Sequence, residues 1–591
     1  YQLRRKNMYL EKINGPEDVK KLTDDEMIKL AAEMRSALLK RASIHGGHFG
    51  PNFGMVEATI ALHYVFDSPK DKIVYDVSHQ TYPHKMLTGR KDAYLYEDKY
   101  NDVSGYSNPH ESEHDFFTIG HTSTSISLAS GLAKARNLKG EDGNVIAVIG
   151  DGSLSGGEAL EGLDYAAELD GNFIIVVNDN DMSIAENHGG MYKNLAELRE
   201  TGGTASNNLF KAFGLDYIYE ENGNDIASLI SLFRKVKDTD HPIVVHIHTQ
   251  KGKGYEIAEK DKEGWHWCMP FDRETGKPTI SFGDGEDYTS ITAEYIMQKA
   301  KSDSEFLVIT PAMPGSAGLN QEQRKELGLQ YVDVGIAEEQ AVAMASGAAK
   351  NGAKPLVVTN TTFIQRAYDQ ISHDVCINNS SVTILLNYNS FDSLTDVTHL
   401  GIFGLAAYTN VPNLVVLAPT SKDEYLAMLD WSVDQKEHPV MILIPGNQVT
   451  YREADKDFNR LNHFKVEEAG EKVAILALGD FYQRGEQLSA KIKAELGFTP
   501  TLINPRFASG IDKELLESLS ERHQMVITME DGILSGGFGE KIASFYGSSD
   551  MKVKNYGLEK KFYDRYDPNE LLKEVGMTPA QIIADICNQL K

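Results

Sequence analysis

Two short polar segments, each directly after an apolar run, carry side chains suited to holding a metal ion. An apolar run at 145–149 is followed by GDG, and a second run at 173–177 is followed by NDN. Asp151 and Asn180 supply one carboxylate and one amide oxygen, which are too few donors to enclose a cation. Such a pair suits Mg²⁺, which keeps several waters and takes its remaining oxygens from substrate phosphates.

A strand–helix–strand unit would bring these two residues together. Both apolar runs have the length and the flanking turn residues of buried strands. Between them, five apolar residues share one helical face: Ala159, Leu160, Leu163, Ala166 and Ala167. Parallel strands joined by such a crossover end at the same edge of the sheet, where open α/β sheets bind ligands. GDG alone is more often an ordinary turn, but GDG followed by NDN is much more specific.

Glycines follow the first run closely and favour a phosphate at the same edge. They stand at 150, 152, 156 and 157. A glycine lets the backbone approach a ligand, and a helix N-terminus favours negative charge. The sequence therefore predicts a Mg²⁺–phosphate site here.

The composition is that of an ordinary globular chain of several domains. It has 591 residues, 41% of them hydrophobic and 25% charged, with a net charge of −27. This charge argues against nucleic acid or an anionic membrane surface as a partner. No apolar stretch reaches the length of a membrane span, and the first residues lack an apolar signal region. Three widely spaced cysteines form neither a zinc nor a disulfide pattern, which favours a reducing cytoplasm.

Alternating helix and strand signals predict the fold class, which is α/β with three doubly wound, mainly parallel domains. The predicted domains are 1–274, 288–455 and 464–591, and the polar, glycine-rich stretch 275–287 is a linker. In the third domain the first strand signal begins near Lys472, and the domain closes on a helix from Pro579 to Leu590.

Motifs along nearly the whole chain resemble one enzyme family. They include GGHFG, DVSHQTYPHKMLTGR, GHTSTSIS, GDGSLSGGEALEGL, NDNDMSIAEN, TQKGKGYE, DVGIAEEQAV and TFIQRAYDQISHDV. The order of domains resembles that of transketolase-type thiamine-diphosphate enzymes. Within this class the motifs are most similar to those of the 1-deoxy-D-xylulose-5-phosphate synthase family.

The resemblance implies a role for each matching residue. Glu338 would hydrogen-bond N1′ of the cofactor's aminopyrimidine and so promote deprotonation of C2, and Phe363 would stack on that ring. His48, His79 and His399 would exchange protons during the carbonyl chemistry. Mg²⁺ would be held by Asp151, Asn180 and the carbonyl of Met182. Further cofactor contacts would come from His79, Gly120, His121, Thr122, Gly152, Ser153, Asn180, Met182, Ile336 and Arg366.

The implied reaction is the decarboxylation of pyruvate and the transfer of its two-carbon unit to an aldehyde. The family's acceptor is glyceraldehyde 3-phosphate, and the product feeds isoprenoid and thiamine synthesis. The implied cofactors are thiamine diphosphate and Mg²⁺, and the implied assembly is a homodimer that binds small molecules only.

The departures from the family pattern concentrate at the acceptor's phosphate. The family uses a tyrosine and two arginines there, whereas this chain has Asn360, Tyr388 and the segment LIPGN at 443–447. Neutral groups replace a bidentate arginine poorly. The expected aspartate before the THLG turn is Thr395, although Asp396 is adjacent, and His399 is kept.

Three functions remain open. The first is a synthase of this family. The second keeps thiamine chemistry in a transketolase-like or acyloin-forming reaction with a different acceptor, either an unphosphorylated or a larger aldehyde. The third is a catalytically silent binding protein, against which the retention of Glu338, Asp151 and Asn180 argues.

Overall fold

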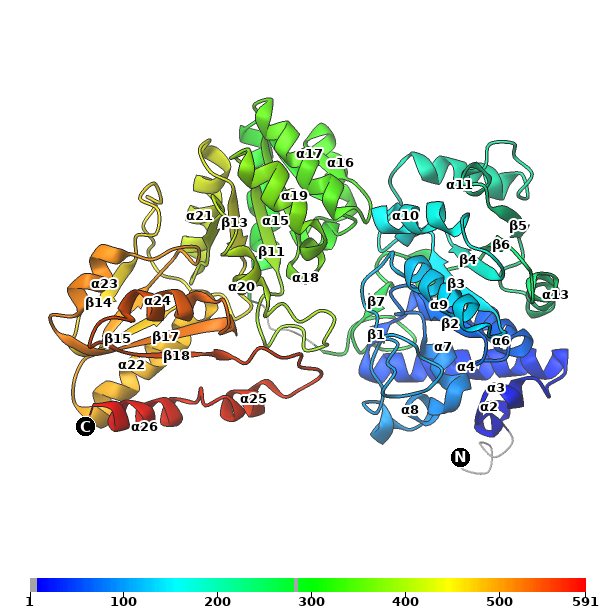
Figure 1. The fold of residues 1–591 in the computed structure, drawn as a ribbon, viewed down its shortest axis with the longest axis horizontal. Coiled ribbons are helices and arrows are strands. Elements are labelled where there is room, and N and C mark those ends of the chain that lie inside the picture. Colours follow the sequence, from blue (N-terminus) through cyan, green and yellow to red (C-terminus); the bar gives the residue numbers. More distant parts are fainter. Residues whose placement is uncertain (1–7, 281–284, 591) are drawn as a thin grey trace. The chain divides into compact units, whose positions relative to one another are not determined.

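The computed structural model describes residues 8–280 and 285–590, which form two compact units. The N-terminal unit contains the first of these ranges together with Gly335–Ala337, and the C-terminal unit contains the remainder. Each unit is built on parallel β-sheets covered by helices (Figure 1). No helix in the described ranges is long and apolar enough to cross a membrane.

The N-terminal unit has a five-stranded sheet in the order β2-β3-β4-β6-β5. All its neighbouring strands are parallel. The strands are β2 (Lys72–Tyr75), β3 (Val145–Gly150), β4 (Phe173–Asp179), β5 (Asp216–Glu220) and β6 (Pro242–His248). The two strands that the sequence places before GDG and NDN are therefore neighbours, β3 and β4, and Gly150 pairs with Asn178 at their carboxyl ends.

Side chains of the central strands alternate between two hydrophobic cores. Ile146 and Val148 belong to one core, whereas Ala147 and Ile149 belong to the other. The first core is covered by α4 (Asp24–His45), α6 (Val56–Val65) and α13 (Ile226–Val236), and the second by α9 (Ser125–Lys139), α10 (Gly157–Ala166) and α11 (Gly190–Glu200). This two-sided burial explains why the strands read as continuous apolar runs.

The C-terminal unit contains two sheets. The first is entirely parallel, in the order β12-β13-β11-β10-β8-β9. Its strands are β8 (Phe306–Thr310), β9 (Tyr331–Asp333), β10 (Lys354–Asn360), β11 (Thr383–Asn387), β12 (Val415–Leu417) and β13 (Val440–Leu443). Its helices include α15 (Tyr288–Ser302), α17 (Glu338–Lys350), α18 (Thr361–Ile364), α20 (Gly404–Tyr408) and α21 (Lys422–Asp434).

The second sheet of this unit has the order β14-β16-β15-β17-β18. Its strands are β14 (Lys465–Glu468), β15 (Lys472–Ala477), β16 (Thr501–Asn504), β17 (His523–Ile533) and β18 (Lys552–Leu558). Its helices include α22 (Tyr482–Leu496), α24 (Phe538–Tyr546), α25 (Pro568–Glu574) and α26 (Pro579–Gln589). The edge strand β14 is antiparallel to β16, and its polar sequence KVEE gave no strand signal.

The predicted fold class is confirmed, because all three large sheets are wholly or mainly parallel and carry helices on their faces. The last two predicted domains share one hydrophobic cluster, in which Val357 and Ile384 pack with Ala474 and Leu476. The two sheets therefore form one compact unit, and the predicted domain boundaries stay predictions. The predicted linker at 275–287 lies partly outside the described residues.

Candidate active site

The carboxyl ends of β3 and β4 bring Asp151 and Asn180 into one buried corner. The backbone N–H of Asp151 donates to the carbonyl of Asn178 at 3.0 Å. Asp151 is 1% exposed, and its Oδ2 accepts a hydrogen bond from Asn187 Nδ2 at 2.7 Å. Met182 pairs with Glu186 in a single antiparallel bridge, which folds the chain after NDN back on itself.

Unpartnered oxygens in this corner fit a hard cation. Asn180 Oδ1 and Asn187 Oδ1 are buried and have no hydrogen-bond partner. Burial and the neighbouring charge of Asp179 raise the pKa of Asp151 well above its usual value, so its carboxylate needs a positive partner to ionise. Mg²⁺ prefers such oxygen donors. Among residues 8–280 and 285–590 no cluster of three or more His, Cys, Asp or Glu could hold a metal, so any ion here relies on amide, carbonyl and phosphate oxygens.

Asp179, the middle residue of NDN, has a structural role. Although burial opposes ionisation, His246 and Arg199 lower the pKa of Asp179. His246 Nε2 lies 2.8 Å from its Oδ2, and Arg199 lies 2.7 Å from the same atom. Its charge is therefore compensated within the protein, unlike that of Asp151.

The GHTSTS turn lies against the GDGS segment. The buried carboxylate of Asp76 accepts the backbone N–H groups of Ser123 at 2.8 Å and Ser125 at 3.0 Å, which fixes the start of α9. Ser123 Oγ then donates to the carbonyl of Ser153 at 2.7 Å. A Cβ on Gly156 would lie 2.2 Å from Ser123 Oγ, so only glycine fits there. The predicted contacts Gly120, His121 and Thr122 precede Ser123 in this turn, next to Gly152 and Ser153.

Lys251 is a buried cation that the sequence did not single out. Its Nζ donates to the carbonyl of Ser183 at 2.6 Å, beside the loop that follows NDN. Burial lowers the pKa of Lys251 to about 7, while the carboxylate of Asp151 opposes that shift. The signal for this lysine was its place in KGKG, which begins three residues after the end of β6.

The N-terminal unit brings His48 and His79 together with a third histidine, His266. The ring centroids are 5.0 Å apart for His48–His79, 5.7 Å for His48–His266 and 5.2 Å for His79–His266. His266 Nδ1 is buried without a hydrogen-bond partner. Burial, with the positive charge of Lys251, keeps the pKa of His266 well below its usual range. Sequence reasoning missed this residue because only the pairing of β1 (Gly47–His48) with β7 (Trp267–Cys268) brings it close.

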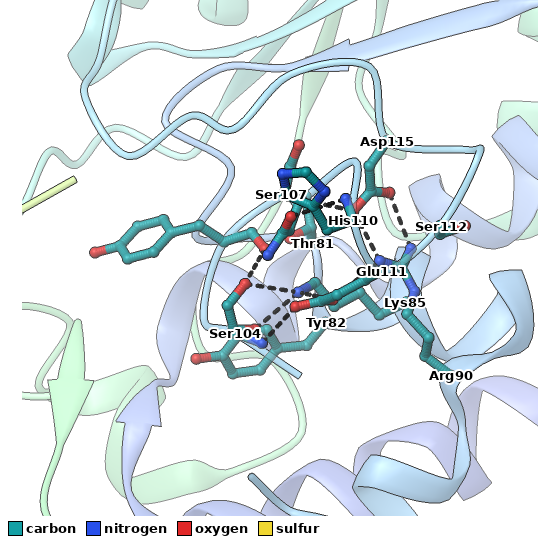
Figure 2. Close-up of polar contacts among 12 residues, drawn as sticks. Thr81, Tyr82, Lys85, Arg90, Ser104, Ser107, His110, Glu111, Ser112 and Asp115 are labelled. Atoms are coloured by element: carbon teal, nitrogen blue, oxygen red, sulfur yellow. Dashed lines mark hydrogen bonds and ion pairs between the residues drawn. The ribbon is translucent and has the colours of Figure 1, made fainter. Parts of the chain in front are cut away.

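A buried network of charges holds the loop that precedes the GHTSTS turn (Figure 2). Lys85 Nζ lies 2.7 Å from Glu111 Oε2 and donates to the carbonyl of Ser104 at 2.8 Å. Arg90 lies 2.7 Å from Asp115 Oδ2, and His84 lies 2.8 Å from Asp115 Oδ1.

The loop held by this network presents an aromatic ring to the histidines. Tyr106 packs edge-on against His48 at 5.6 Å. Ser107 N donates to Ser78 Oγ, which in turn donates to the carbonyl of Ile119, one residue before the GHTSTS turn. The network therefore fixes both the histidine cluster and that turn.

The C-terminal unit buries Glu338 at the first turn of α17. Its side chain is 4% exposed, and Oε2 has no hydrogen-bond partner. Burial raises the pKa of Glu338 to about 7, although the charge of Arg366 opposes the rise. A carboxyl in this environment can share a proton near neutral pH.

Phe363 and His399 form a second group in the C-terminal unit. Their ring centroids are 5.4 Å apart in an edge-to-face arrangement. His399 Nδ1 lies 2.8 Å from Thr398 Oγ1 and 3.8 Å from Asp396 Oδ1. Although burial opposes it, hydrogen bonds from His399 and Thr398 lower the pKa of Asp396, so this carboxylate is ionised beside the ring.

Ile336 belongs to the N-terminal unit by its contacts, and its backbone N–H donates to Ser155 Oγ at 2.8 Å. The predicted residues thus gather in separate groups. Those of the N-terminal unit surround Asp151 and His48, and those of the C-terminal unit surround Glu338 and His399.

Comparison with known families covers most of the chain. Residues 10–206 and 201–249 match the model of 1-deoxy-D-xylulose-5-phosphate synthase, residues 285–450 the transketolase pyrimidine-binding domain, and residues 462–582 the transketolase C-terminal domain. A transketolase mutant from Pichia stipitis matches with a TM-score of 0.43 and 16% identity, covering 96% of this chain and 97% of that one.

Curated relatives match over the full length. The 1-deoxy-D-xylulose-5-phosphate synthase of Shouchella clausii is 36% identical, covering 99% of both chains. That of Clostridium perfringens is 37% identical, covering 96% of this chain and 97% of the relative.

These matches define the chain as a transketolase-type, thiamine-diphosphate-dependent transferase. Within that class it belongs to the 1-deoxy-D-xylulose-5-phosphate synthase family. The family resemblance drawn from the motifs is therefore confirmed, and the silent binding protein is set aside. The roles of the individual site residues stay predictions.

Proposed function

We propose that the chain decarboxylates pyruvate and joins the two-carbon unit to an aldehyde, as the names of its relatives imply. The observation that carries this proposal is Glu338, a buried carboxyl with an unpartnered oxygen and a pKa of about 7. Activation of an aminopyrimidine requires a carboxyl group that is shielded from water and can exchange a proton with the ring near neutral pH. Release of CO₂ from pyruvate by the purified protein, dependent on thiamine diphosphate, tests the proposal.

The cofactor would be held from the corner at the ends of β3 and β4. Asp151, Asn180 and the carbonyl of Met182 would bind Mg²⁺, and the unpartnered Asn180 Oδ1 supports this role. The GHTSTS turn and the GDGS segment would receive the diphosphate. When bound, thiamine diphosphate supplies a carbon nucleophile and an electron sink for the carbonyl chemistry.

Asp151→Ala should abolish Mg²⁺-dependent binding of thiamine diphosphate, because the bound diphosphate loses its bridging cation. Calorimetric titration of cofactor with and without Mg²⁺ measures this. Asp164→Ala, which removes an exposed carboxylate from α10, is the matched control and should bind normally. Unchanged affinity in Asp151→Ala would remove this residue from the metal site.

We propose that the protein acts as a homodimer, since relatives of this class place the cofactor where two domains meet and need the surrounding apolar surfaces covered. Sedimentation equilibrium at micromolar concentration should give a mass near 131 kDa, twice the 65.5 kDa of one chain. A monomer with full activity would contradict the proposal.

A second candidate keeps this chemistry but uses an unphosphorylated acceptor. Two segments that depart from the family pattern, the one after Tyr388 and the one at 443–447, lie close together. A Cβ on Gly446 would lie 2.7 Å from Ser390 Cβ and 3.7 Å from Asp480 Oδ2. Ser390 also hydrogen-bonds Asp392 and Asp531. Carboxyl groups of Asp392, Asp480 and Asp531 therefore lie in the region where the family carries arginines, and none of them can supply the positive charge that a phosphate dianion needs. Steady-state kinetics with D-glyceraldehyde and its 3-phosphate as paired acceptors distinguish the two candidates.

A further inference from the structure

The segment that carries His399 has no regular secondary structure of its own. It runs from Tyr388 to Phe403, between the end of β11 and the start of α20. Tyr388 adopts a left-handed backbone with φ of 57°, which turns the chain sharply as it leaves the strand. Backbone groups of such a segment need partners from elsewhere in the fold. We call it the 388–403 segment.

The second sheet of the C-terminal unit holds the beginning of this segment through one carboxyl group. Asp531, in β17, accepts the backbone N–H of Phe391 at 2.9 Å on Oδ1. Its Oδ2 lies 2.5 Å from Ser390 Oγ. Asp531 is 6% exposed, so these contacts form away from water, where hydrogen bonds are costly to lose.

The same sheet and its C-terminal extension hold the rest of the segment. Tyr566 OH donates to the carbonyl of Phe391. The backbone N–H of Arg565 donates to the carbonyl of Thr395 at 2.8 Å, and Asp564 Oδ1 accepts the N–H of Val397 at 3.2 Å. At the far end, the N–H of Ile533 donates to the carbonyl of Ile402 at 3.1 Å. The position of His399 therefore depends on residues beyond 530.

The contacts of Ser390 require a proton on a neighbouring carboxyl group. Ser390 Oγ lies 2.5 Å from Asp531 Oδ2 and 2.6 Å from Asp392 Oδ1, yet a hydroxyl has one hydrogen to donate. One of the two carboxyls must supply the second hydrogen. Asp531 is the better candidate, because it is buried beside the carboxyl of Asp480, although Arg484 on the same cavity wall favours ionisation. Burial and the charge of Asp480 raise the pKa of Asp531 well above its usual value.

We propose that Asp531 is a positioning residue for the transfer step, fixing the 388–403 segment, and with it Tyr388 and His399, from the second sheet of the C-terminal unit. The proposal rests on the proposed function, in which His399 takes part in the carbonyl chemistry. It gives this sheet, to which no cofactor contact is assigned, a role in the reaction.

Asp531→Ala should lower kcat/KM for the aldehyde by at least about tenfold, because two buried hydrogen bonds to the segment are lost. Acceptor-independent release of CO₂ from pyruvate should change less than about twofold, since the side chain of Asp531 hydrogen-bonds Ser390 and Phe391 rather than Glu338. Hydrogen–deuterium exchange of the peptide covering 388–403 should accelerate in the same variant. A loss in the aldehyde kinetics with nearly unchanged CO₂ release indicates a displaced 388–403 segment, whereas a general loss of fold would lower both activities.

Asp531→Asn is the sharper variant. Its amide oxygen keeps the bond to Phe391 N, and its amide nitrogen donates as the protonated acid does, so the aldehyde kinetics should return to within about threefold of wild type. Thr528→Val is the control, because Thr528 also lies in β17 but its hydroxyl donates to Asn555 and not to the 388–403 segment. The activity of this variant should be unchanged.

Two outcomes would overturn the proposal. One is an Asp531→Ala variant whose aldehyde kinetics equal those of Thr528→Val. The other is an equal loss in the CO₂-releasing half and the transfer half of the reaction. A wild-type protein that releases no CO₂ from pyruvate would instead reject the proposed function itself, so the two failures are distinguishable.

Discussion

Glu338→Gln is expected to slow hydrogen–deuterium exchange at C2 of bound thiamine diphosphate by about 10²–10⁴-fold, the usual contribution of a positioned proton-transfer group. An amide cannot take up the proton that the carboxyl of Glu338 would share with N1′ in the proposed role. The cofactor should still bind, because the metal corner lies in the N-terminal unit, at Asp151 and Asn180. Exchange measured by NMR after acid quench gives the rate directly.

The same substitution should change the pH dependence of stability in the cofactor-free protein. The pKa of Glu338 is about 7 in the folded state, against an ordinary value of 4.5. The group binds its proton more tightly when folded, so its contribution to stability is full below pH 4.5 and is lost as the pH rises to about 7. Glu338→Gln lacks this loss. Its free energy of unfolding, compared with that of wild type, should therefore rise by about 3 kcal/mol between pH 4.5 and 8.

Glu339→Gln is the matched control, because Glu339 is the next residue of α17 and is only half-buried. It should leave both the exchange rate and the pH profile of stability near those of wild type. Near-normal C2 exchange in Glu338→Gln, or a stability difference that does not vary with pH, would show that Glu338 is not the proton-sharing group. Urea denaturation at several pH values measures the second quantity.

The corner built from Asp151 and Asn180 could be predicted because its information is local. Each residue follows a continuous apolar run, and the parallel crossover rule brings the ends of β3 and β4 together. The apolar runs themselves result from burial on both faces of the sheet. Glu338 was found differently, through the family motif around it, and its burial became visible only in the structure.

The residues that were missed depend on long-range pairing. His266 reaches His48 because β1 pairs with β7, and no spacing along the chain announces that contact. Asn187 reaches Asp151 only because the chain folds back after Met182. Asp531 gave no signal either, because an aspartate after an apolar strand is ordinary. Its importance comes from the 388–403 segment, whose backbone finds its partners in a different sheet.

The acceptor kinetics should show weak recognition of phosphate. A desolvated phosphate dianion needs charged partners, and each hydrogen bond to a charged group contributes roughly 1.5–3 kcal/mol. Replacing two arginines by Tyr388 and the segment LIPGN at 443–447 should therefore cost roughly three orders of magnitude in kcat/KM for glyceraldehyde 3-phosphate. The buried amide of Asn360 is also engaged, because its Oδ1 lies 3.1 Å from Ser316 Oγ.

Steady-state kinetics comparing D-glyceraldehyde with its 3-phosphate decide the matter, and the expected result is a small ratio between the two efficiencies. Tyr388→Arg should raise that ratio, because it returns a cation to one of the positions where the family carries an arginine. Tyr388→Phe is the control for loss of the hydroxyl group alone. A strong preference for the phosphorylated aldehyde in the wild-type protein would contradict the prediction. It would then assign phosphate binding to another cation, for which Arg484 is the first candidate because it lines the same cavity as Asp480 and Asp531.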